Sequence, residues 1–351
     1  MTHGGAPTPP RLSICIATLN RAAFIGETLD SIVSQLRSDV EIVIVDGASV
    51  DNTKDVVGQY VVQYPNIRYY RESANCGVDG DYDKAVGYAT GEYCWLLPDD
   101  DVLVPGAIAC VLAAAGVERD LIVVNSEIWN ADFTRNLHTR MLNFSEDRVY
   151  RLGEEEQAFT DLATCLSYIG SVVIRRSVWL SRDRRSYDGT VFGHVGVIFQ
   201  QPALSNIAVI AEPLILNRYG NGQWTPRSFE IWYFKWPQLI WSLAHFSVVA
   251  RSRIVQREPW RQPRRLFKSR AMGDYSRQEF TRFIAERASG GIAALALAIS
   301  VFPAKVANAM WVLYYSLANR SALYSLFDLL KSRHSSVVSR SIARVLNISV
   351  I

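Results

Sequence analysis

The sequence predicts an α/β protein with a mostly parallel sheet, a mixed extension of that sheet and a helical C-terminal region. Its first third alternates short apolar runs with helical patterns, the order expected when crossover helices join parallel strands. The middle third is less regular, with polar stretches and Gly and Asp turns, which favours antiparallel or mixed pairing. The last third changes to aromatic, basic and then uncharged apolar segments. With 351 residues, 49% of them hydrophobic, the chain is long enough for one or two domains and is not wholly disordered.

Strands and helices are expected to alternate along the first third. The apolar residues between 22 and 36 recur at helical spacing, and Pro105 suits the first turn of a helix that reaches residue 115. Strands are expected at 12–17, 41–45, 67–70, 93–97 and 121–124. Helices are expected between them at 22–36, 51–63, 82–89 and 105–115. Because crossover helices cover both faces of such a sheet, its strands should be buried.

Changes of composition divide the chain into four expected regions. Apolar pieces at 169–174 and 195–199 belong to the extension of the sheet. The regions are a loose tail at 1–10, an α/β half at 11–124, a second half at 125–230 and a helical region at 231–351.

The helical region has features of a membrane-associated segment. Residues 251–282 hold ten Lys or Arg against three Asp or Glu, and anionic lipid attracts each such cation by about 1 kcal/mol. The uncharged run 288–304 has 17 residues, short of the ~20 that a spanning helix needs. Two interpretations remain open: a helical hairpin at the membrane interface, or a helical subdomain packed on the rest of the protein.

Composition and missing motifs exclude several classes of protein. Lys and Arg number 37 against 34 Asp and Glu, which argues against a nucleic-acid binder. The five cysteines are scattered, without a CxxC pair, so neither a disulfide framework nor a zinc site is expected and reduced thiols fit best. The N-terminus lacks the basic and apolar segments of a secretory signal, so we expect a cytoplasmic protein. No GxGxxG or Walker A motif follows the first strand, which excludes a Rossmann dehydrogenase and a P-loop ATPase.

Polar residues follow three of the expected strands, at the edge where α/β sheets bind ligands. They are Thr18, Asn20 and Arg21 after the first strand, Asp46 and Ser49 after the second, and Asp99, Asp100 and Asp101 after the fourth. Clustered carboxylates suit Mg²⁺ or Mn²⁺, which neutralise a departing diphosphate. The alternative for the three aspartates is an acidic surface turn.

Four motifs in order resemble those of the family-2 glycosyltransferases of GT-A fold. They are Ser-Ile-Cys-Ile-Ala-Thr-Leu-Asn-Arg at 13–21, Ile-Val-Asp-Gly-Ala-Ser-Val-Asp-Asn-Thr at 44–53, Asn-Cys-Gly at 75–77, and the segment 91–101 that ends in the three aspartates. The segments 77–83, 192–199 and 211–221 further resemble abequosyltransferase-like enzymes of O-antigen assembly.

This resemblance implies an inverting, metal-dependent transfer of a hexosyl or deoxyhexosyl group in the synthesis of a surface polysaccharide. The donor would be a nucleotide-diphosphate sugar bound by residues 11–124. The acceptor, on the side of residues 125–230, would be a polyprenyl-linked oligosaccharide at the cytoplasmic face of the inner membrane.

The resemblance also assigns roles to individual residues. The donor-binding set is Thr18, Asn20, Arg21, Asp46, Ser49, Gly77, Asp79, Asp81, Asp83, Asp99, Asp100 and Arg218, and the metal ligands are Asp99 and Asp101. The sequence departs from the family pattern in two ways: Pro98 stands where the first acidic residue is usual, and Tyr82 and Asp83 replace Arg and Asn. For the acids at 79, 81 and 83 the alternative is a solvated start of a helix. For the loop that begins at Arg218, the alternative is an ordinary connecting loop without a role in binding.

The general base is expected at His194, which occupies the place of the family's usual acid, with Asp188 as the second candidate. A structural histidine is the alternative.

Two other functions of the whole protein remain to be compared. A nucleotidyltransferase would need a Gly-rich basic loop after the first strand, which is missing. A non-catalytic glycan-binding or assembly scaffold would retain the fold without binding the donor.

Overall fold

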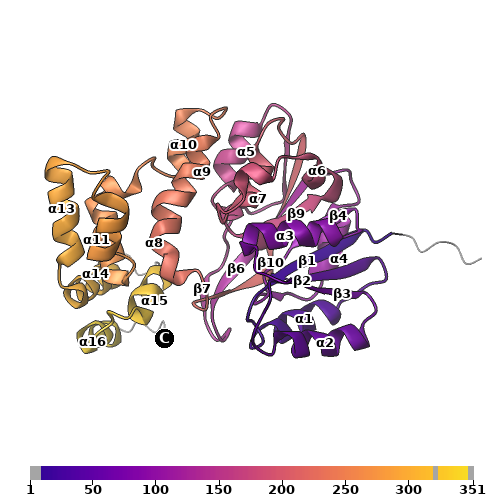
Figure 1. Ribbon diagram of the computed structural model, residues 1–351, viewed down its shortest axis with the longest axis horizontal. Coiled ribbons are helices and arrows are strands. Elements are labelled where there is room, and N and C mark those ends of the chain that lie inside the picture. Colours follow the sequence, from indigo (N-terminus) through magenta and orange to yellow (C-terminus); the bar gives the residue numbers. More distant parts are fainter. Residues whose placement is uncertain (1–8, 319–322, 347–351) are drawn as a thin grey trace, which may run out of the picture. The chain divides into compact units, whose positions relative to one another are not determined.

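The computed structural model describes residues 9–318 and 323–346, which form two compact units (Figure 1). The sheet unit consists of Met1–Ile128, Thr139–Arg218 and Leu243–Ala250, and the helical unit consists of Trp129–His138, Tyr219–Ser242 and Arg251–Ile351. Most of the expected tail, residues 1–8, lies outside the described residues.

Four parallel strands form the first part of the sheet, in the order β3-β2-β1-β4. They are β1 (Leu12–Thr18), β2 (Val40–Asp46), β3 (Ile67–Arg71) and β4 (Tyr93–Leu96). β1 and β2 are fully buried apart from Ala17, and their runs of Ile and Val explain this because both faces are covered by helices. Thr18 pairs in register with Asp46, so these two strands end at the same level.

The rest of the sheet is mixed, as the sequence predicts. Its order continues β4-β9-β6-β10-β5, with β7 beside β6 and β8 beside β10. β9 is antiparallel to β4 and β6, and β10 is antiparallel to β5 and β8. The bounds are β5 (Val102–Leu103), β6 (Leu121–Asn130), β7 (Asn136–His138), β8 (Arg148–Arg151), β9 (Val172–Arg175) and β10 (Asn206–Tyr219). The pairing of β5 with β10 connects the segment after Asp101 to the strand that ends beside Arg218.

Helices follow the strands of the sheet unit in the predicted alternation. They are α1 (Ile25–Val33), α2 (Thr53–Gln63), α3 (Gly77–Tyr88), α4 (Ala107–Ala114), α5 (Glu155–Leu162), α6 (Arg176–Ser181) and α7 (Gly193–Phe199), with short 3₁₀ turns η1 (Cys165–Ser167), η2 (Ile169–Ser171) and η3 (Arg185–Tyr187). α3 begins five residues earlier than predicted, and the apolar piece at 195–199 is helical.

The helical unit has its own core around Phe229, Trp260, Leu266 and Tyr275, which confirms the predicted helical C-terminal region. Its elements are η4 (Thr225–Arg227), α8 (Ser228–Glu230), the π-helical turn η5 (Ile231–Lys235), α9 (Trp236–Ser242), α10 (Val248–Ile254), η6 (Pro259–Arg261), α11 (Pro263–Met272), α12 (Arg277–Glu279), the π-helical turn η7 (Phe280–Ile284), α13 (Gly290–Val301), α14 (Ala304–Ala318), α15 (Leu323–Lys331) and α16 (Val337–Val345). Among the described residues no single helix is long and apolar enough to cross a bilayer. α13 and α14 together have the required length and apolarity, but a bend of 93° separates them.

Candidate active site

The three aspartates lie between β4 and β5, and Arg21 joins two of them to the end of β1. The Arg21 Nε is 3.3 Å from Asp99 Oδ1, and its Nη2 is 2.8 Å from Asp100 Oδ2. Burial and the Asp100 carboxylate together raise the pKa of Asp99 to about 7, although Arg21 and the Thr18 hydroxyl oppose the rise. The first and fourth strand ends therefore meet, as the sequence predicts.

Asp101 has a different environment from its two neighbours. It is 1% exposed, its Oδ1 accepts the backbone N–H of Arg218 at 2.7 Å, and its Oδ2 accepts the hydroxyl of Tyr168. Burial and the Asp100 charge raise the pKa of Asp101 well above its usual value, although these two hydrogen bonds lower it. Because both of its oxygens are engaged within the protein, Asp101 anchors the loop. Asp99 and Asp100 are better placed to hold a metal ion than the predicted pair of Asp99 and Asp101.

Arg218 holds this loop from within the protein. Its Nε donates to the backbone oxygen of Asp100 at 2.7 Å, and its Nη2 pairs with Glu27 on α1. The guanidinium groups of Arg218 and Arg21 both lie 5.3 Å from the ring centre of Phe24. Arg218 thus lies beside the aspartates. Its Nε and Nη2 donate to acceptors of the protein itself, which indicates that Arg218 positions the loop.

The turns after β1 and β2 are joined by hydrogen bonds. The backbone N–H of Asn20 donates to Ser49 Oγ, and the Asn20 side chain accepts from the backbone of Val50, both at 2.8 Å. Asn20 has a φ of 53°, in the left-handed region that asparagine tolerates better than most residues. Asp46 is fully buried beneath this turn, where its Oδ1 accepts the N–H of Ser49 at 2.7 Å and its Oδ2 accepts the Tyr69 hydroxyl. Asp46 therefore shapes the turn from within.

Two acids of α3 bond to the segment before and after Asp188. Asp79 accepts the backbone N–H groups of Val191 and Gly193 at 2.7 and 2.8 Å, which fixes the start of α7. Asp83 accepts the indole N–H of Trp179 at 2.8 Å and pairs with the Arg184 guanidinium at 2.7 Å. Both carboxylates therefore connect α3 to residues between 179 and 193. These bonds do not bring them to the strand ends where the other predicted donor-binding residues lie.

Asp81 is the member of the three that faces the end of β2. It is 4% exposed, and burial raises its pKa. Its Oδ1 has no hydrogen-bond partner among the described residues. A Cβ added to Gly47 would come within 2.8 Å of Asp81 Oδ2, so the glycine after Asp46 leaves room for this carboxylate. Gly77, with a φ of 79°, supplies the left-handed backbone from which α3 begins.

His194 lies inside the sheet unit on α7. It is 4% exposed, its Nε2 is 2.8 Å from the backbone oxygen of Leu166, and burial lowers its pKa to about 4. A carbonyl oxygen only accepts, so Nε2 carries the hydrogen and Nδ1 is a bare lone pair with no partner among the described residues. Asp188, the second candidate, follows η3 and is exposed.

Three tyrosines contact the buried aspartates or the backbone beside them, and none of them is among the site residues predicted from the sequence. Tyr168 bonds to Asp101 across 67 positions of the chain, which no local pattern reveals. Tyr69 is on the strand next to Asp46, and Tyr82, which departs from the family pattern, donates to the backbone oxygen of Leu97 at 3.0 Å. The Tyr82 hydroxyl thereby supports the backbone just before the aspartates.

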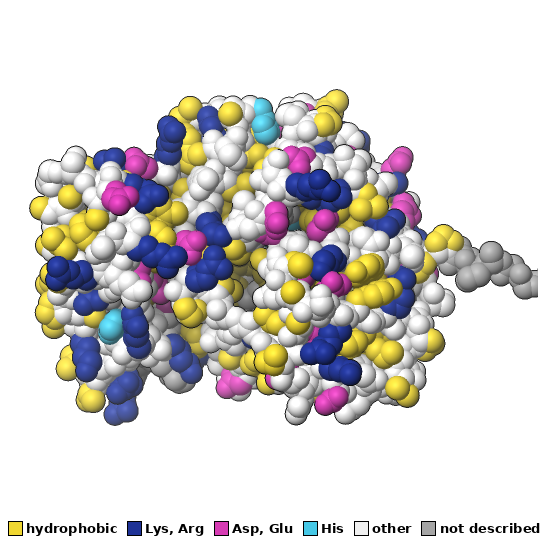
Figure 2. All heavy atoms as spheres, in the orientation of Figure 1, with side chains coloured by type: hydrophobic (Ala, Val, Ile, Leu, Met, Phe, Trp, Pro, Cys, Tyr) yellow, Lys and Arg dark blue, Asp and Glu magenta, His cyan; other side chains and the backbone are white. Residues whose placement is uncertain are grey.

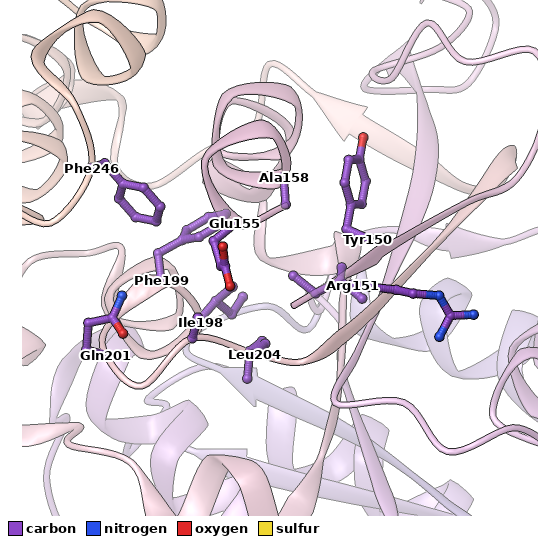
Figure 3. Close-up of a pocket in the computed structure, with 11 residues that line it drawn as sticks. Tyr150, Arg151, Glu155, Ala158, Ile198, Phe199, Gln201, Leu204 and Phe246 are labelled. Atoms are coloured by element: carbon purple, nitrogen blue, oxygen red, sulfur yellow. The ribbon is translucent and has the colours of Figure 1, made fainter. Parts of the chain in front are cut away.

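A small space of about 10 Å³ elsewhere in the sheet unit is unrelated to these residues (Figure 3). Ile198, Phe199, Leu204 and Phe246 contribute to its apolar lining, and the Arg151 side chain points away from it. Its volume barely admits one water molecule, so it is a packing defect and not a substrate site.

Comparisons with known proteins identify relatives in sequence and in fold. The model of the family described as "Glycosyl transferase family 2" matches residues 13–182. The abequosyltransferase RfbV of Salmonella typhimurium is 30% identical over 225 residues, which are 60% of this chain and 67% of that protein. A Campylobacter jejuni enzyme named GalNAc(5)-diNAcBac-PP-undecaprenol beta-1,3-glucosyltransferase is 32% identical over 107 residues, but the match spans only 30% of this chain and 35% of that enzyme.

Solved structures show the same fold at low sequence identity. S. aureus TarS 1–349 in complex with UDP superposes with a TM-score of 0.54 and 13% identity, over 95% of this chain and 92% of that one. Its complex with UDP-GlcNAc gives 0.52 and 12%, over 96% and 91%. These likenesses establish the fold alone, which confirms the predicted α/β class. With the sequence matches, they show that the chain belongs to glycosyltransferase family 2.

Proposed function

We propose that this glycosyltransferase moves a sugar from a nucleotide-diphosphate donor to a lipid-linked glycan in the synthesis of a surface polysaccharide such as O-antigen. The observation that supports this most directly is the ion-paired cluster of Arg21, Asp99 and Asp100 at the ends of β1 and β4, beside the turn that follows β2. TarS complexes with UDP and UDP-GlcNAc, which share the fold, support a nucleotide-sugar donor. The name of the Campylobacter relative includes PP-undecaprenol and supports the lipid-linked part. The match to an abequosyltransferase supports the O-antigen part through the resemblance that the sequence motifs carry.

We expect Asp99 and Asp100 to hold Mg²⁺ or Mn²⁺ together with the donor. Among the described residues no group of three or more His, Cys, Asp or Glu side chains forms a metal site. Two carboxylates nevertheless fit a hard cation that takes its remaining ligands from water and substrate phosphates. A bound ion would stabilise the charge of the departing nucleoside diphosphate. Arg21 orients the two carboxylates by pairing with both and opposes the rise in the pKa of Asp99. Asp81 is the candidate for contact with the donor's hydroxyl groups.

An inverting transfer needs a group that removes the proton of the acceptor hydroxyl. His194 has the tautomer that this requires, because its Nδ1 is deprotonated and without a partner among the described residues. Its low pKa keeps it neutral at pH 7. Asp188 is the alternative, since its exposed carboxylate is open to an acceptor without any rearrangement.

Donor binding tests this proposal and separates an enzyme from a scaffold. Calorimetry with UDP, CDP, GDP and dTDP in Mn²⁺ should show selection of one nucleotide, which the Asp100→Asn variant loses and the surface control Asp55→Asn retains. A protein that binds none of the four is a scaffold, and the proposal then fails. A screen for hydrolysis or transfer across nucleotide sugars, with and without divalent metal, identifies the sugar.

We also propose that the protein is peripheral on the cytoplasmic face of the inner membrane, attached through its helical unit. Residues 251–351 contain 17 Lys and Arg against 5 Asp and Glu, whereas residues 1–250 contain 20 against 29. α13 and α14 expose several large apolar side chains, including Val301, Met310 and Leu317 at 55%, 52% and 62%. Figure 2 shows yellow side chains along one edge of this unit with dark-blue cations around them. Apolar insertion and attraction to anionic lipid then act together.

Sedimentation with lipid vesicles tests this attachment. The full chain should bind vesicles that contain phosphatidylglycerol and not pure phosphatidylcholine vesicles. The double variant Met310→Glu, Leu317→Glu should weaken binding at least about tenfold, because each change removes a buried apolar contact and adds repulsion. The control Val50→Glu, Val62→Glu changes two side chains on the sheet unit that are each 90% exposed and should have little effect. Equal loss in both variants would contradict the assigned surface.

A further inference from the structure

The helical unit contains a groove of about 770 Å³ that none of the assigned roles explains. This volume is within the range of small-ligand sites and exceeds the space that a single inorganic ion needs. Its aromatic lining consists of Tyr233, Phe234, Trp241, Trp260 and Phe283. Trp260 is only 2% exposed, so the four partly exposed rings supply the apolar surface for the organic part of a ligand.

Two π-helical turns supply much of this lining. Tyr233, Phe234 and Lys235 belong to η5, and Phe283 belongs to η7. A π-helical turn inserts a residue into a helix and so changes the direction of the side chains that follow it. Such turns are uncommon and occur frequently at functional sites. The two π-helical turns both line this groove. Their presence points to a ligand independently of the volume of the groove.

The charges of the groove favour an anion. Its two acids are already paired with arginines outside the lining, Glu230 with Arg227 at 3.3 Å and Glu258 with Arg261 at 2.6 Å. Its cations are Lys235, Arg257 and Arg287.

Two of these cations are placed against the aromatic rings. The guanidinium of Arg257 lies 5.8 Å from the ring centre of Trp241, and that of Arg287 lies 5.5 Å from the ring centre of Phe234. Arg287 also donates from Nη1 to the backbone oxygen of Phe283 at 2.9 Å, which orients its guanidinium. Forked guanidinium groups beside apolar faces suit a phosphate that is attached to a hydrophobic or ring-shaped group.

We infer that this groove binds an organic diphosphate, namely the diphosphate end of the lipid that bears the acceptor glycan. A neutral glycan would bring no charge to pair with Arg257 and Arg287, and an inorganic anion would leave the aromatic faces unused. A nucleoside diphosphate has the same anionic chemistry. The lipid-borne form is favoured because the same unit exposes the apolar side chains of α13 and α14. This inference rests on the proposed lipid-linked acceptor, and it adds a site for that acceptor outside the sheet unit.

Binding of farnesyl diphosphate to the full chain, measured by calorimetry below its micellar concentration, tests the inference. The double variant Arg257→Gln, Arg287→Gln should weaken binding at least about tenfold, because charge-assisted hydrogen bonds to phosphate are lost. The control Arg253→Gln, Arg277→Gln removes the same charge from exposed positions of the same unit and should change the affinity less than twofold.

Further ligands separate the possible sources of the signal. Farnesol and inorganic diphosphate should each bind at least tenfold more weakly than farnesyl diphosphate, and UDP should bind with unchanged affinity in the groove variant. Equal loss in the control, equal binding of farnesol, or competition between UDP and farnesyl diphosphate would overturn the inference. A failure of UDP to bind at all would instead refute the donor site, while the farnesyl diphosphate result would still decide the groove.

Discussion

The Tyr168→Phe substitution tests the anchoring of the aspartate loop by removing a single oxygen atom. The Tyr168 hydroxyl donates to Asp101, whose carboxylate is 1% exposed and has the Arg218 N–H as its other partner. Leaving a buried polar group without one of its hydrogen-bond partners costs about 1–3 kcal/mol, and the aromatic ring stays in place. We therefore expect the free energy of unfolding to fall by about 1–3 kcal/mol. Because Asp100 and Asp99 precede the loosened residue, kcat/KM for donor hydrolysis should fall as well.

Urea unfolding and steady-state kinetics measure the two effects on the same samples. Tyr60→Phe is the matched control, since the Tyr60 hydroxyl also donates to an aspartate, Asp30, at 2.7 Å, but that aspartate is exposed. Its cost should be below about 1 kcal/mol, with no change in kcat/KM. Equal losses of stability in the two variants, or unchanged kinetics in Tyr168→Phe, would show that burial of Asp101 does not anchor the loop.

Three further predictions concern other parts of the sheet unit. Hydrogen bonds hold the pKa of the buried Glu41 below its usual value despite its burial, so the stability that its carboxylate contributes is present above about pH 4.3 and lost as the pH falls. Glu41→Gln should therefore cost about 2–3 kcal/mol at pH 7 and far less at pH 3, by thermal unfolding. His194→Ala should reduce kcat at least about 10²-fold with donor binding intact. Because the pKa of His194 is about 4, the step in the pH profile of kcat that this substitution removes should lie near pH 4; a fully active variant would contradict this role. Gly47→Ala should weaken UDP binding about tenfold by displacing Asp81, whereas Gly58→Ala, whose added Cβ meets nothing within 4 Å, should not; calorimetry decides between them.

The parallel half of the fold could be predicted because its signals are local. Runs of Ile and Val mark β1 and β2, and the polar residues directly after each run mark the strand ends. In parallel strands these ends fall at one edge, so Thr18 and Asp46 had to be neighbours once both strands were assigned. The antiparallel partners β9, β6 and β10 come from distant positions, and their order in the sheet depends on long-range packing that no short pattern encodes.

The roles of the acidic residues of α3 show a signal that was present but unused. Successive helical residues are 100° apart, so positions 79 and 83 share a face and position 81 points the other way. The structure follows this geometry: Asp79 and Asp83 bond to residues between 179 and 193, and Asp81 faces Gly47. By contrast, the contact of Arg218 with Asp100 spans 118 positions of the chain and depends on the pairing of β5 with β10.

The charge balance at the aspartate loop predicts that donor binding requires a divalent cation. Asp99 and Asp100 share the nearby guanidinium of Arg21. A nucleoside diphosphate would add at least two negative charges, and one like-charge pair at 4 Å costs about 4 kcal/mol at an effective dielectric constant of 20. Even after screening, EDTA should therefore weaken UDP binding at least about 10²-fold, and Mn²⁺ should restore it. Hexaamminecobalt(III), which exchanges no ligands, separates general screening from direct coordination: full recovery with it, or equal UDP affinity in EDTA, would contradict a metal held by these carboxylates.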